Sequence, residues 1–461
     1  MENIHLPKKF EAKMREKLGD PGFDEFAEAL SRKPEISIRI NPAKGENLFN
    51  NEKRVPWCDF GRYLEVRPAF VWDPLYHAGA YYAQEASSML FANVVDFSKD
   101  LKVLDLCASP GGKSSLLLSF LSKNSLLVSN ELVGKRASVL YENLVKWGCT
   151  NNIITNNRVA DFAYLKGYFD VVMIDAPCSG EGMFRKDREA LEQWSEGLVH
   201  QCSMVQKEIL THALGLVKPG GMLIYSTCTY EEAENEENIQ WMFQSMGRNM
   251  EPAKIPVHKD WGVQTIEIPV EGGRQQEGYY CYPHKLKGEG QFVAAMRVMS
   301  NHTFKDNARG GSNAIKLLSG KDAAMLKPYV ELGEGEVILQ EKEEDIFAFP
   351  AALQRELGLY DKMRVLKKGT SLGRLIRQNF IPSHEMVMDG LASETMPRVA
   401  LNIEQALDFM QRKNLDIKPE NTKGWFVYSY EGVDIGLAKN LGDRINNHYP
   451  ADWRIRKEPK L

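Results

Sequence analysis

Short apolar segments alternate with amphipathic helical patterns between residues 101 and 230, and this alternation constrains the fold more than any other feature. We expect strands at 103–106, 125–131, 152–158, 169–177 and 222–229. Helices are expected from the loop at 107–113 through Phe120, from Gly134 to Trp147 and from Leu198 to Val217. The pattern predicts an α/β fold with a parallel sheet covered by helices on both faces. A last strand, over 290–298, is expected at the sheet edge.

The flanking segments differ from this core. Because 461 residues exceed one ordinary hydrophobic core, we expect several domains. The N-terminal part begins with helical patterns over 7–18 and 23–30, continues with an extended stretch at 36–42, and has a helical second half in 71–95. Polar residues 299–310 are typical of a linker. We therefore predict parts at 1–95, 96–300, 311–385 and 386–461.

Composition excludes several classes of protein. No apolar run approaches the length of a membrane span, and the N-terminus lacks a signal-peptide core, so we expect a cytoplasmic protein. The seven scattered cysteines form no CxxC pair, so we expect thiols and no metal site. The net charge of −4 means that any nucleic-acid site must be a local patch. One candidate patch is a basic cluster formed by Lys362, Arg364, Lys367, Lys368, Arg374 and Arg377. A solvated charged loop is the alternative interpretation.

A glycine-containing loop follows the first expected strand, which ends at Asp105. Its residues are Cys107, Ala108, Ser109, Pro110, Gly111, Gly112 and Lys113. A nucleoside-triphosphate loop requires glycine at position 107, and the GxGxxG dinucleotide pattern is absent. The remaining interpretation is an S-adenosylmethionine site, in which backbone amides at a helix N-terminus meet the methionine carboxylate.

Acidic residues close the next strands of the expected sheet. Glu131 ends the second strand, Asp161 follows the third and Asp175 ends the fourth. Strand carboxyl ends face one crevice in an open α/β sheet, so Glu131 is placed to bind ribose hydroxyls and Asp161 the adenine amino group. Any one of them alone would be interpreted as a solvated carboxylate. Asp175 has two possible partners, the cofactor and a substrate base, and the sequence does not separate them.

Two cysteines lie just past strand ends at the same crevice. Cys178 follows Asp175 in DAPCSG, and Cys228 lies in STCT. A single buried cysteine is usually a small hydrophobic residue. Two thiols beside a cofactor crevice instead indicate covalent chemistry, since a thiolate is a strong nucleophile. Lys113 is the nearest candidate cation to favour a thiolate.

Several motifs carry a family resemblance. CASPGGK, DAPCSGEGMFRKD, YSTCTYEEAENEENI and YHAGAYYAQEASSM (76–89) resemble the NOL1/NOP2/Sun family of RNA cytosine-5 methyltransferases, and QNFIPSHEM (378–386) resembles its RsmF-type bacterial ribosomal RNA branch. Ser109, where alanine is common in the family, is a small departure. The resemblance covers nearly the whole chain. It implies a Rossmann-like S-adenosylmethionine-dependent core with an RNA-recognition-like N-terminal region and a PUA-like C-terminal domain.

The resemblance also implies roles for individual residues. Cys228 attacks C6 of a cytosine, which makes C5 nucleophilic toward the methyl group, and Cys178 helps to release the product. Residues 107–113, Glu131, Asp161 and Asp175 match cofactor positions of the family, and Arg136 lies where a basic residue flanks the cofactor in some members. The implied substrate is ribosomal RNA, 16S by branch, and the implied partner is the small ribosomal subunit, bound by a monomer. A catalytically idle RNA-binding assembly factor and a transfer RNA enzyme remain alternatives.

Overall fold

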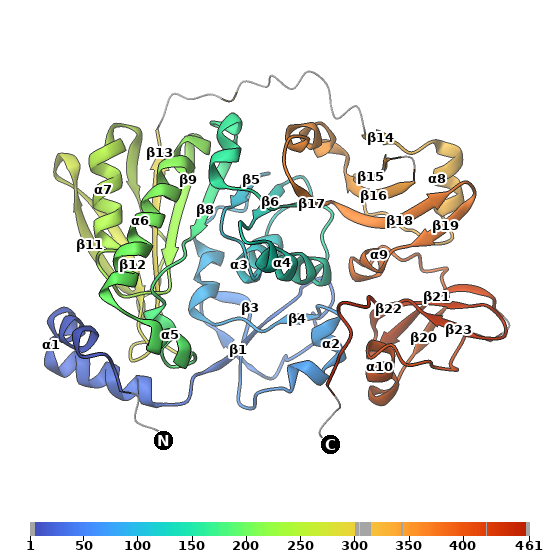
Figure 1. Ribbon diagram of the computed structural model, residues 1–461, viewed down its shortest axis with the longest axis horizontal. Coiled ribbons are helices and arrows are strands. Elements are labelled where there is room, and N and C mark those ends of the chain that lie inside the picture. Colours follow the sequence, from blue (N-terminus) through green and yellow to red (C-terminus); the bar gives the residue numbers. More distant parts are fainter. Residues whose placement is uncertain (1–4, 300–303, 305–314, 343, 421, 458–461) are drawn as a thin grey trace.

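The computed structural model of the chain describes residues 5–299, 304, 315–342, 344–420 and 422–457. Within these residues the central sheet has ten strands, and smaller sheets flank it (Figure 1). The central strands are β5 (Lys102–Asp105), β6 (Leu126–Asn130), β7 (Asn152–Thr155), β8 (Phe169–Asp175), β9 (Val217–Thr227), β10 (Met250–Ala253), β11 (Gln264–Val270), β12 (Arg274–Cys281), β13 (Gln291–Val298) and β17 (Val365–Lys368). Their order is β11-β12-β13-β9-β8-β5-β6-β7-β17, with β10 beside β13.

The parallel part of this sheet confirms the predicted alternation. Strands β9, β8, β5, β6 and β7 are neighbours in that order, and each adjacent pair is parallel. The helices between and after them are α3 (Gly112–Leu118), α4 (Gly134–Trp147), α5 (Arg188–Gln193), α6 (Glu196–Ala213) and α7 (Glu236–Met246). The strands are short and buried on both faces, as continuous apolar runs predict. The α/β fold class is confirmed.

The prediction that the strand over 290–298 lies at the sheet edge is wrong. β13 pairs antiparallel with β9 on one side and with β12 on the other. The hairpin of β11 and β12 turns at Gly272 and Gly273, whose φ angles of 80° and 71° favour glycine. β11 is mostly exposed and lacks a continuous apolar run. The apolar pattern of the sequence therefore did not reveal the hairpin of β11 and β12, which extends the sheet.

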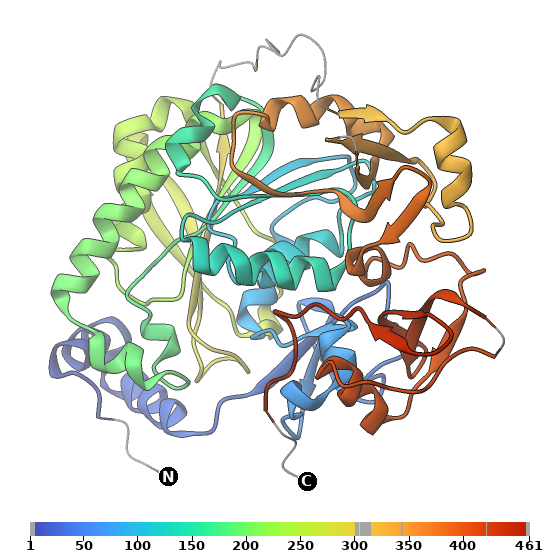
Figure 2. The same ribbon diagram turned by 45° about the vertical axis from the view of Figure 1, so that its right-hand side comes forward.

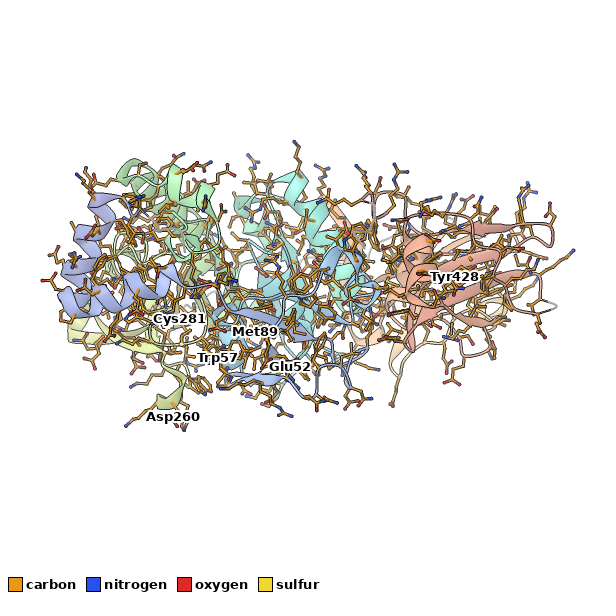
Figure 3. The ribbon with its side chains drawn as sticks, turned by 90° about the horizontal axis from the view of Figure 1, so that it is seen from below. Glu52, Trp57, Met89, Asp260, Cys281 and Tyr428 are labelled. Atoms are coloured by element: carbon orange, nitrogen blue, oxygen red, sulfur yellow. The ribbon has the colours of Figure 1, made fainter. Side chains whose placement is uncertain are left out.

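The N-terminal part packs on the core. Its elements are α1 (Lys8–Ser31), β1 (Ile36–Ile40), β2 (Lys53–Val55), β3 (Cys58–Leu64), α2 (Pro74–His77) and β4 (Tyr81–Tyr82), and its sheet order is β2-β3-β1-β4. Gly19, with φ 69°, interrupts α1 between the two predicted helical patterns. The helix expected late in 71–95 is a short 3-10 segment, η2 (Ser87–Asn93). Trp57, Met89 and Cys281, labelled in Figure 3, share one buried cluster that joins this part to the core.

Three lysines of α1 form ion pairs with the core. Lys9, Lys13 and Lys17 recur every four residues, so they share one face of the helix. Lys13 contacts the carboxylate of Glu231 at 2.8 Å, and Lys17 contacts that of Glu236 at 3.0 Å. Lys9 pairs with Glu196 at the start of α6. Figure 2 shows α1 crossing below the helices of the core.

The C-terminal part contains two sheets. The first has β14 (Ile315–Leu317), β15 (Glu336–Glu341), β16 (Asp345–Pro350), β18 (Thr370–Ile376) and β19 (Asn379–Pro382), with α8 (Gly320–Leu326) and α9 (His384–Met388) beside it. The second has β20 (Arg398–Ala400), β21 (Gly424–Tyr430), β22 (Val433–Asn440) and β23 (Ile445–Asn447), with α10 (Ile403–Met410). Tyr428, far to the right in Figure 3, is buried in this second sheet. No helix in the described residues is long and apolar enough to cross a membrane.

One strand of the C-terminal part belongs to the central sheet. β17 pairs antiparallel with β7, so residues 365–368 extend the core at its far edge. The predicted segment 311–385 is therefore structurally continuous with the core along this strand. The linker expected at 299–310 lies, apart from residues 299 and 304, outside the described residues.

A buried ion pair anchors the chain that follows Cys178. The Arg185 guanidinium lies 2.9 Å from the Glu289 carboxylate, and the two side chains are only 5% and 2% exposed. Arg185 also donates to the carbonyl of Gly288 at 3.0 Å. Removing one partner of such a pair leaves an unpaired buried charge, which is strongly destabilising.

Glu289→Gln should lower the free energy of unfolding by about 3 kcal/mol, measured by urea denaturation. The matched control is Glu25→Gln, which removes an exposed ion pair with Lys285 and should cost less than about 1 kcal/mol. Equal losses in the two variants would contradict the anchoring role of the Arg185–Glu289 pair.

Candidate active site

The pairing of β8 with β9 brings the two cysteines together. Asp175 at the end of β8 lies opposite Ser226 in β9. Cys178 and Cys228 follow these residues within the next three positions of each chain segment. Their Sγ atoms are 3.1 Å apart, and the backbone amide of Cys228 donates to Sγ of Cys178 at 3.2 Å. Both thiols are half-buried, so neither is fully enclosed by the protein.

Hydrogen bonds join the loops that carry the two thiols. The hydroxyls of Ser179 and Thr229 lie 2.9 Å apart, directly after the two cysteines. The amide of Gly182 donates to the carbonyl of Cys228 at 2.8 Å. These contacts make the loops a single unit and fix the distance between the sulfur atoms.

The buried carboxylate of Glu234 bonds to the loop that carries Cys178. Glu234 accepts from the amide of Ser179 at 3.1 Å and from the side-chain amide of Gln206 at 2.7 Å. Burial raises the pKa of Glu234 to about 6, although these hydrogen bonds favour the charged form. Sequence reasoning missed Glu234. Nothing in the acidic run 231–237 distinguishes Glu234 from its neighbours in the sequence, although the structure buries it fully and leaves Glu232 and Glu237 exposed.

The two cysteines differ in their electrostatic surroundings. The hydrogen bond between the two thiols, followed by burial, raises the pKa of the Cys178 thiol well above its usual range, against the bond from the Cys228 amide, which lowers it. The negative charge of Glu234 also raises this pKa. Cys178 is therefore a protonated thiol at neutral pH. Its sulfur is close enough to that of Cys228 for a hydrogen bond between the two side chains.

An ion pair lies beside the sulfur atoms. Nζ of Lys113 contacts the carboxylate of Asp175 at 2.7 Å, and the hydroxyl of Ser226 donates to the other carboxylate oxygen at 2.7 Å. Burial lowers the pKa of Lys113, but the charge and hydrogen bond of Asp175 outweigh it, and the negative charge of a Cys228 thiolate adds to the rise. Lys113 is therefore a fixed cation next to the cysteine pair.

The predicted cofactor loop is held in place at both sides. Ser109 donates its hydroxyl to the carbonyl of Arg136 at 2.9 Å, and the Arg136 guanidinium donates to the carbonyl of Ser109 at 3.0 Å. The amide of Ala108 donates to the carbonyl of Asn130 at 2.9 Å. Gly111 has φ 109°, a conformation that favours glycine, and α3 begins at the next residue. The first amides of α3 therefore have no carbonyl partner within the helix.

The expected acidic residues occupy different environments. Glu131 is buried, and its carboxylate accepts from the amide of Val133 at 2.9 Å and lies 3.6 Å from the Arg136 guanidinium. Asp161 lies in η3 (Val159–Leu165), where it accepts from the amide of Arg158 at 3.0 Å. Asp161 is about one-third exposed, so its carboxylate remains accessible beside the third strand of the parallel sheet.

Comparisons with known proteins decide the family. Three family models match: the 16S rRNA methyltransferase RsmB/F at residues 92–297, the N-terminal domain of 16S rRNA methyltransferase RsmF at 6–86, and the methyltransferase RsmF PUA domain at 397–455. A ribosomal RNA small subunit methyltransferase F from Aliivibrio fischeri is 31% identical, covering 98% of each chain. The chain belongs to the RsmF family of methyltransferases.

Other relatives agree with this assignment. The Shewanella loihica ribosomal RNA small subunit methyltransferase F is 28% identical over 93% of this chain and 91% of its own. Among solved structures, a methyltransferase homolog protein from Pyrococcus horikoshii is 27% identical, with a TM-score of 0.53, over 64% of this chain and 96% of that chain. The family resemblance of the sequence motifs is thus confirmed, as is the methyltransferase core fold with a C-terminal PUA domain.

A buried arginine, which sequence reasoning missed, connects the RsmF-type N-terminal part to the cofactor loop. Arg39 in β1 is fully buried and donates to Gln84 at 2.7 Å and to the carbonyl of Ser115 in α3 at 3.2 Å. Its guanidinium lies 4.0 Å from the Trp147 ring centroid. Burial lowers the pKa of Arg39 to about 10, so it remains charged at neutral pH. The available signal in the sequence was an arginine between two isoleucines, Ile38 and Ile40, in an expected strand.

The predicted basic cluster is not one continuous cationic surface. Lys367 is buried because β17 enters the central sheet, and its ammonium donates to the carbonyl of Gly369. Lys368 is largely buried and pairs with Glu341 at 3.1 Å. The remaining four cations, Lys362, Arg364, Arg374 and Arg377, are exposed. Arg374 pairs with Glu344. The prediction of one RNA-binding patch that includes all six cations is therefore wrong for the buried Lys367 and the largely buried Lys368. Within the described residues, no group of three His, Cys, Asp or Glu side chains is arranged to hold a metal ion.

Asp105 lies under the loop at the end of β5. It is fully buried, and one carboxylate oxygen accepts from the hydroxyl of Ser114 at 2.6 Å. The other oxygen has no hydrogen-bond partner among the described residues. Burial raises the pKa of Asp105 from 3.8 to about 7, against the opposing hydrogen bond from Ser114.

Asp105→Asn should remove a pH-dependent loss of stability. Because folding raises the pKa of Asp105, the neutral acid is favoured in the folded state, and stability falls as pH rises from about 4 through 7. A pKa of about 7 against 3.8 corresponds to roughly 4 kcal/mol for a fully buried group. Urea unfolding at pH 4 to 8 should show wild type and variant converging at low pH, with the variant relatively more stable at pH 8. Parallel curves would contradict the buried neutral acid.

Proposed function

We propose that this chain transfers a methyl group from S-adenosylmethionine to C5 of a cytosine in the RNA of the small ribosomal subunit. The observation that carries the proposal is the cysteine pair, with Sγ atoms 3.1 Å apart beside the Lys113–Asp175 ion pair. Relatives named ribosomal RNA small subunit methyltransferase F support this class of substrate. The half-buried thiols support a reaction on a ligand that enters from solvent.

The residues of the loop fit S-adenosylmethionine. The cofactor carries a carboxylate, ribose hydroxyls and an adenine amino group. The amides of 107–113 at the start of α3 suit the carboxylate, the buried Glu131 suits the ribose hydroxyls, and Asp161 suits the adenine amino group. The unpartnered oxygen of Asp105 offers a further acceptor beneath the loop. When bound, the cofactor supplies an electrophilic methyl group.

The protein's own residues perform the covalent steps. Cytosine C5 is a weak nucleophile until a thiolate adds to C6, which moves electron density to C5. Cys228 forms this bond to C6, and the Lys113 cation favours its thiolate. Asp175, held by Lys113 and Ser226, hydrogen-bonds the amino edge of the base and stabilises the protonated adduct. Cys178 then assists loss of the C5 proton and release of Cys228 from C6.

We also propose a division of labour among the parts of the chain. Residues 96–300 carry the reaction, residues 1–95 and 311–385 support the core and contact RNA, and residues 386–461 bind RNA as a PUA-like domain. The family model for the RsmF PUA domain supports the last assignment. A ribosomal RNA substrate favours a cytoplasmic location. A monomer remains our prediction for the free enzyme.

Cys228→Ala should abolish methyl transfer, because no thiolate remains to add to C6. Cys178→Ala should instead accumulate a covalent RNA–protein adduct that survives denaturing electrophoresis, because product release is impaired. The measurement combines tritiated methyl transfer to small-subunit RNA with a gel-shift under denaturing conditions. Cys202→Ala, which removes another partly buried thiol, in α6, that has no role in the proposed reaction, is the matched control and should resemble wild type.

The opposite pattern would reverse the roles of the two cysteines. Bisulfite sequencing of ribosomal RNA with and without the gene tests the substrate separately. An unchanged 5-methylcytosine map in ribosomal RNA would overturn the proposed substrate, and loss of a site in transfer RNA would identify the alternative.

The exposed cations of the basic cluster should contribute to RNA binding. Replacing both Lys362 and Arg364 with alanine should weaken binding and reduce the slope of log K against log salt by roughly one unit per lost phosphate contact. Lys368→Ala is the matched control, since that ammonium is already paired with Glu341 and should leave the slope unchanged. An unaltered slope in the double variant would assign those exposed cations to a solvated loop.

A further inference from the structure

The distance between the two sulfur atoms has a consequence beyond methyl transfer. A disulfide bond requires two thiols whose sulfur atoms can approach to about 2 Å without movement of the backbone. Sγ of Cys178 and Sγ of Cys228 already lie 3.1 Å apart, and both are free thiols. The remaining gap is about one ångström, which small side-chain rotations can close.

The loops that carry these thiols are held at the right separation. The bond between the Ser179 and Thr229 hydroxyls and the bond from Gly182 to the carbonyl of Cys228 join the two chains on either side of the sulfur atoms. Cys178 is also fixed by the hydrogen bond from the Cys228 amide to its sulfur. A disulfide would therefore add a covalent bond to a geometry that already exists.

The site also favours the first step of thiol oxidation. A hydroperoxide reacts with a thiolate and must reach it from solvent. Both thiols are half-buried, in contrast to the buried Cys58 and Cys281. The Lys113 ammonium, held by Asp175 at 2.7 Å, attracts a negative charge on Cys228. Cys178, by contrast, stays protonated next to Glu234 and is placed as the second thiol.

We propose that Cys178 and Cys228 form a reversible disulfide on exposure to hydroperoxides. The Cys228 thiolate attacks a peroxide oxygen, the O–O bond breaks, and Cys228 becomes a sulfenic acid while the leaving hydroxide takes a proton to form water. The Cys178 sulfur then attacks the Cys228 sulfur, loses its proton, and displaces the hydroxyl as a second water. Two thiols and one hydrogen peroxide thus give one disulfide and two waters.

The disulfide would block methyl transfer and protect the site. It removes the Cys228 thiolate that the proposed function requires, so the expected loss of activity rests on that function. It also prevents irreversible oxidation, because a sulfenic acid captured by a neighbouring thiol does not proceed to the sulfinic acid. A dithiol reductant returns both cysteines to the active form by thiol–disulfide exchange.

The decisive experiment maps thiols in the full chain without RNA. The protein is treated with hydrogen peroxide, blocked with an alkylating agent under denaturing conditions, digested and analysed by mass spectrometry. We expect loss of two of the seven thiols, a linked peptide pair containing Cys178 and Cys228, and full return of both thiols after dithiothreitol. The pair should form roughly tenfold faster than Cys202 oxidises, since burial raises the pKa of that thiol to about 11.

Two variants test which cysteine is oxidised first. Cys178→Ser should stop at a Cys228 sulfenic acid that reacts with dimedone, whereas Cys228→Ser should leave Cys178 reduced under the same treatment. Circular dichroism melting checks that both variants fold. Retention of both thiols in the wild-type protein, or oxidation of Cys228 without a link to Cys178, would overturn the proposal. Because no RNA is present, this result is independent of whether ribosomal RNA is the substrate.

Discussion

The site depends on one contact, which joins two sulfur atoms at the ends of neighbouring parallel strands. The pairing of β8 with β9 places Asp175 opposite Ser226, and this register alone brings the following loops together. Register alone does not fix the conformation of the two loops. The Ser179–Thr229 bond and the Glu234 carboxylate restrict that conformation, since each bonds to the residue that follows a cysteine or to its amide. Backbone pairing and buried polar groups thus position Cys178 and Cys228.

The sequence predicted what depends on local pattern. Periodic apolar segments located the parallel strands and their helices, and motif order located the cysteines, the loop at 107–113 and the strand-end acids. It failed at two places in the central sheet. β13 is interior because the hairpin of β11 and β12, which immediately precedes it in the chain and whose outer strand is mostly polar, pairs with it. Lys367 is buried because β17 pairs with β7, over two hundred residues earlier. Charge alone could not reveal that burial, since lysine in a short basic run is usually solvated.

The flanking parts are joined to the core by buried or partly buried charges. Arg39 reaches from β1 to the carbonyl of Ser115 in α3, so the N-terminal sheet supports the helix that follows the cofactor loop. Arg185 and Glu289 anchor the chain after Cys178 in the same way. Such groups contribute little net stability compared with apolar residues of the same size, but each is costly to separate from its partners. They therefore favour one arrangement of the parts over others, which a site assembled from several segments requires.

The charges on either side of the cysteine pair give the two sulfur atoms different chemistry. Glu234 lies on the Cys178 side and opposes ionisation of that thiol, in addition to the effects of its hydrogen bond and burial. Lys113 lies on the Cys228 side, where a thiolate and the ammonium stabilise one another. Both cysteines lie just past the end of a strand, so their positions in the sequence do not show which one attacks. The three-dimensional arrangement is asymmetric, because the Lys113 cation lies on the Cys228 side and the Glu234 carboxylate on the Cys178 side. In both proposals, methyl transfer and oxidation, the nucleophile is Cys228, which is the cysteine beside the Lys113 cation.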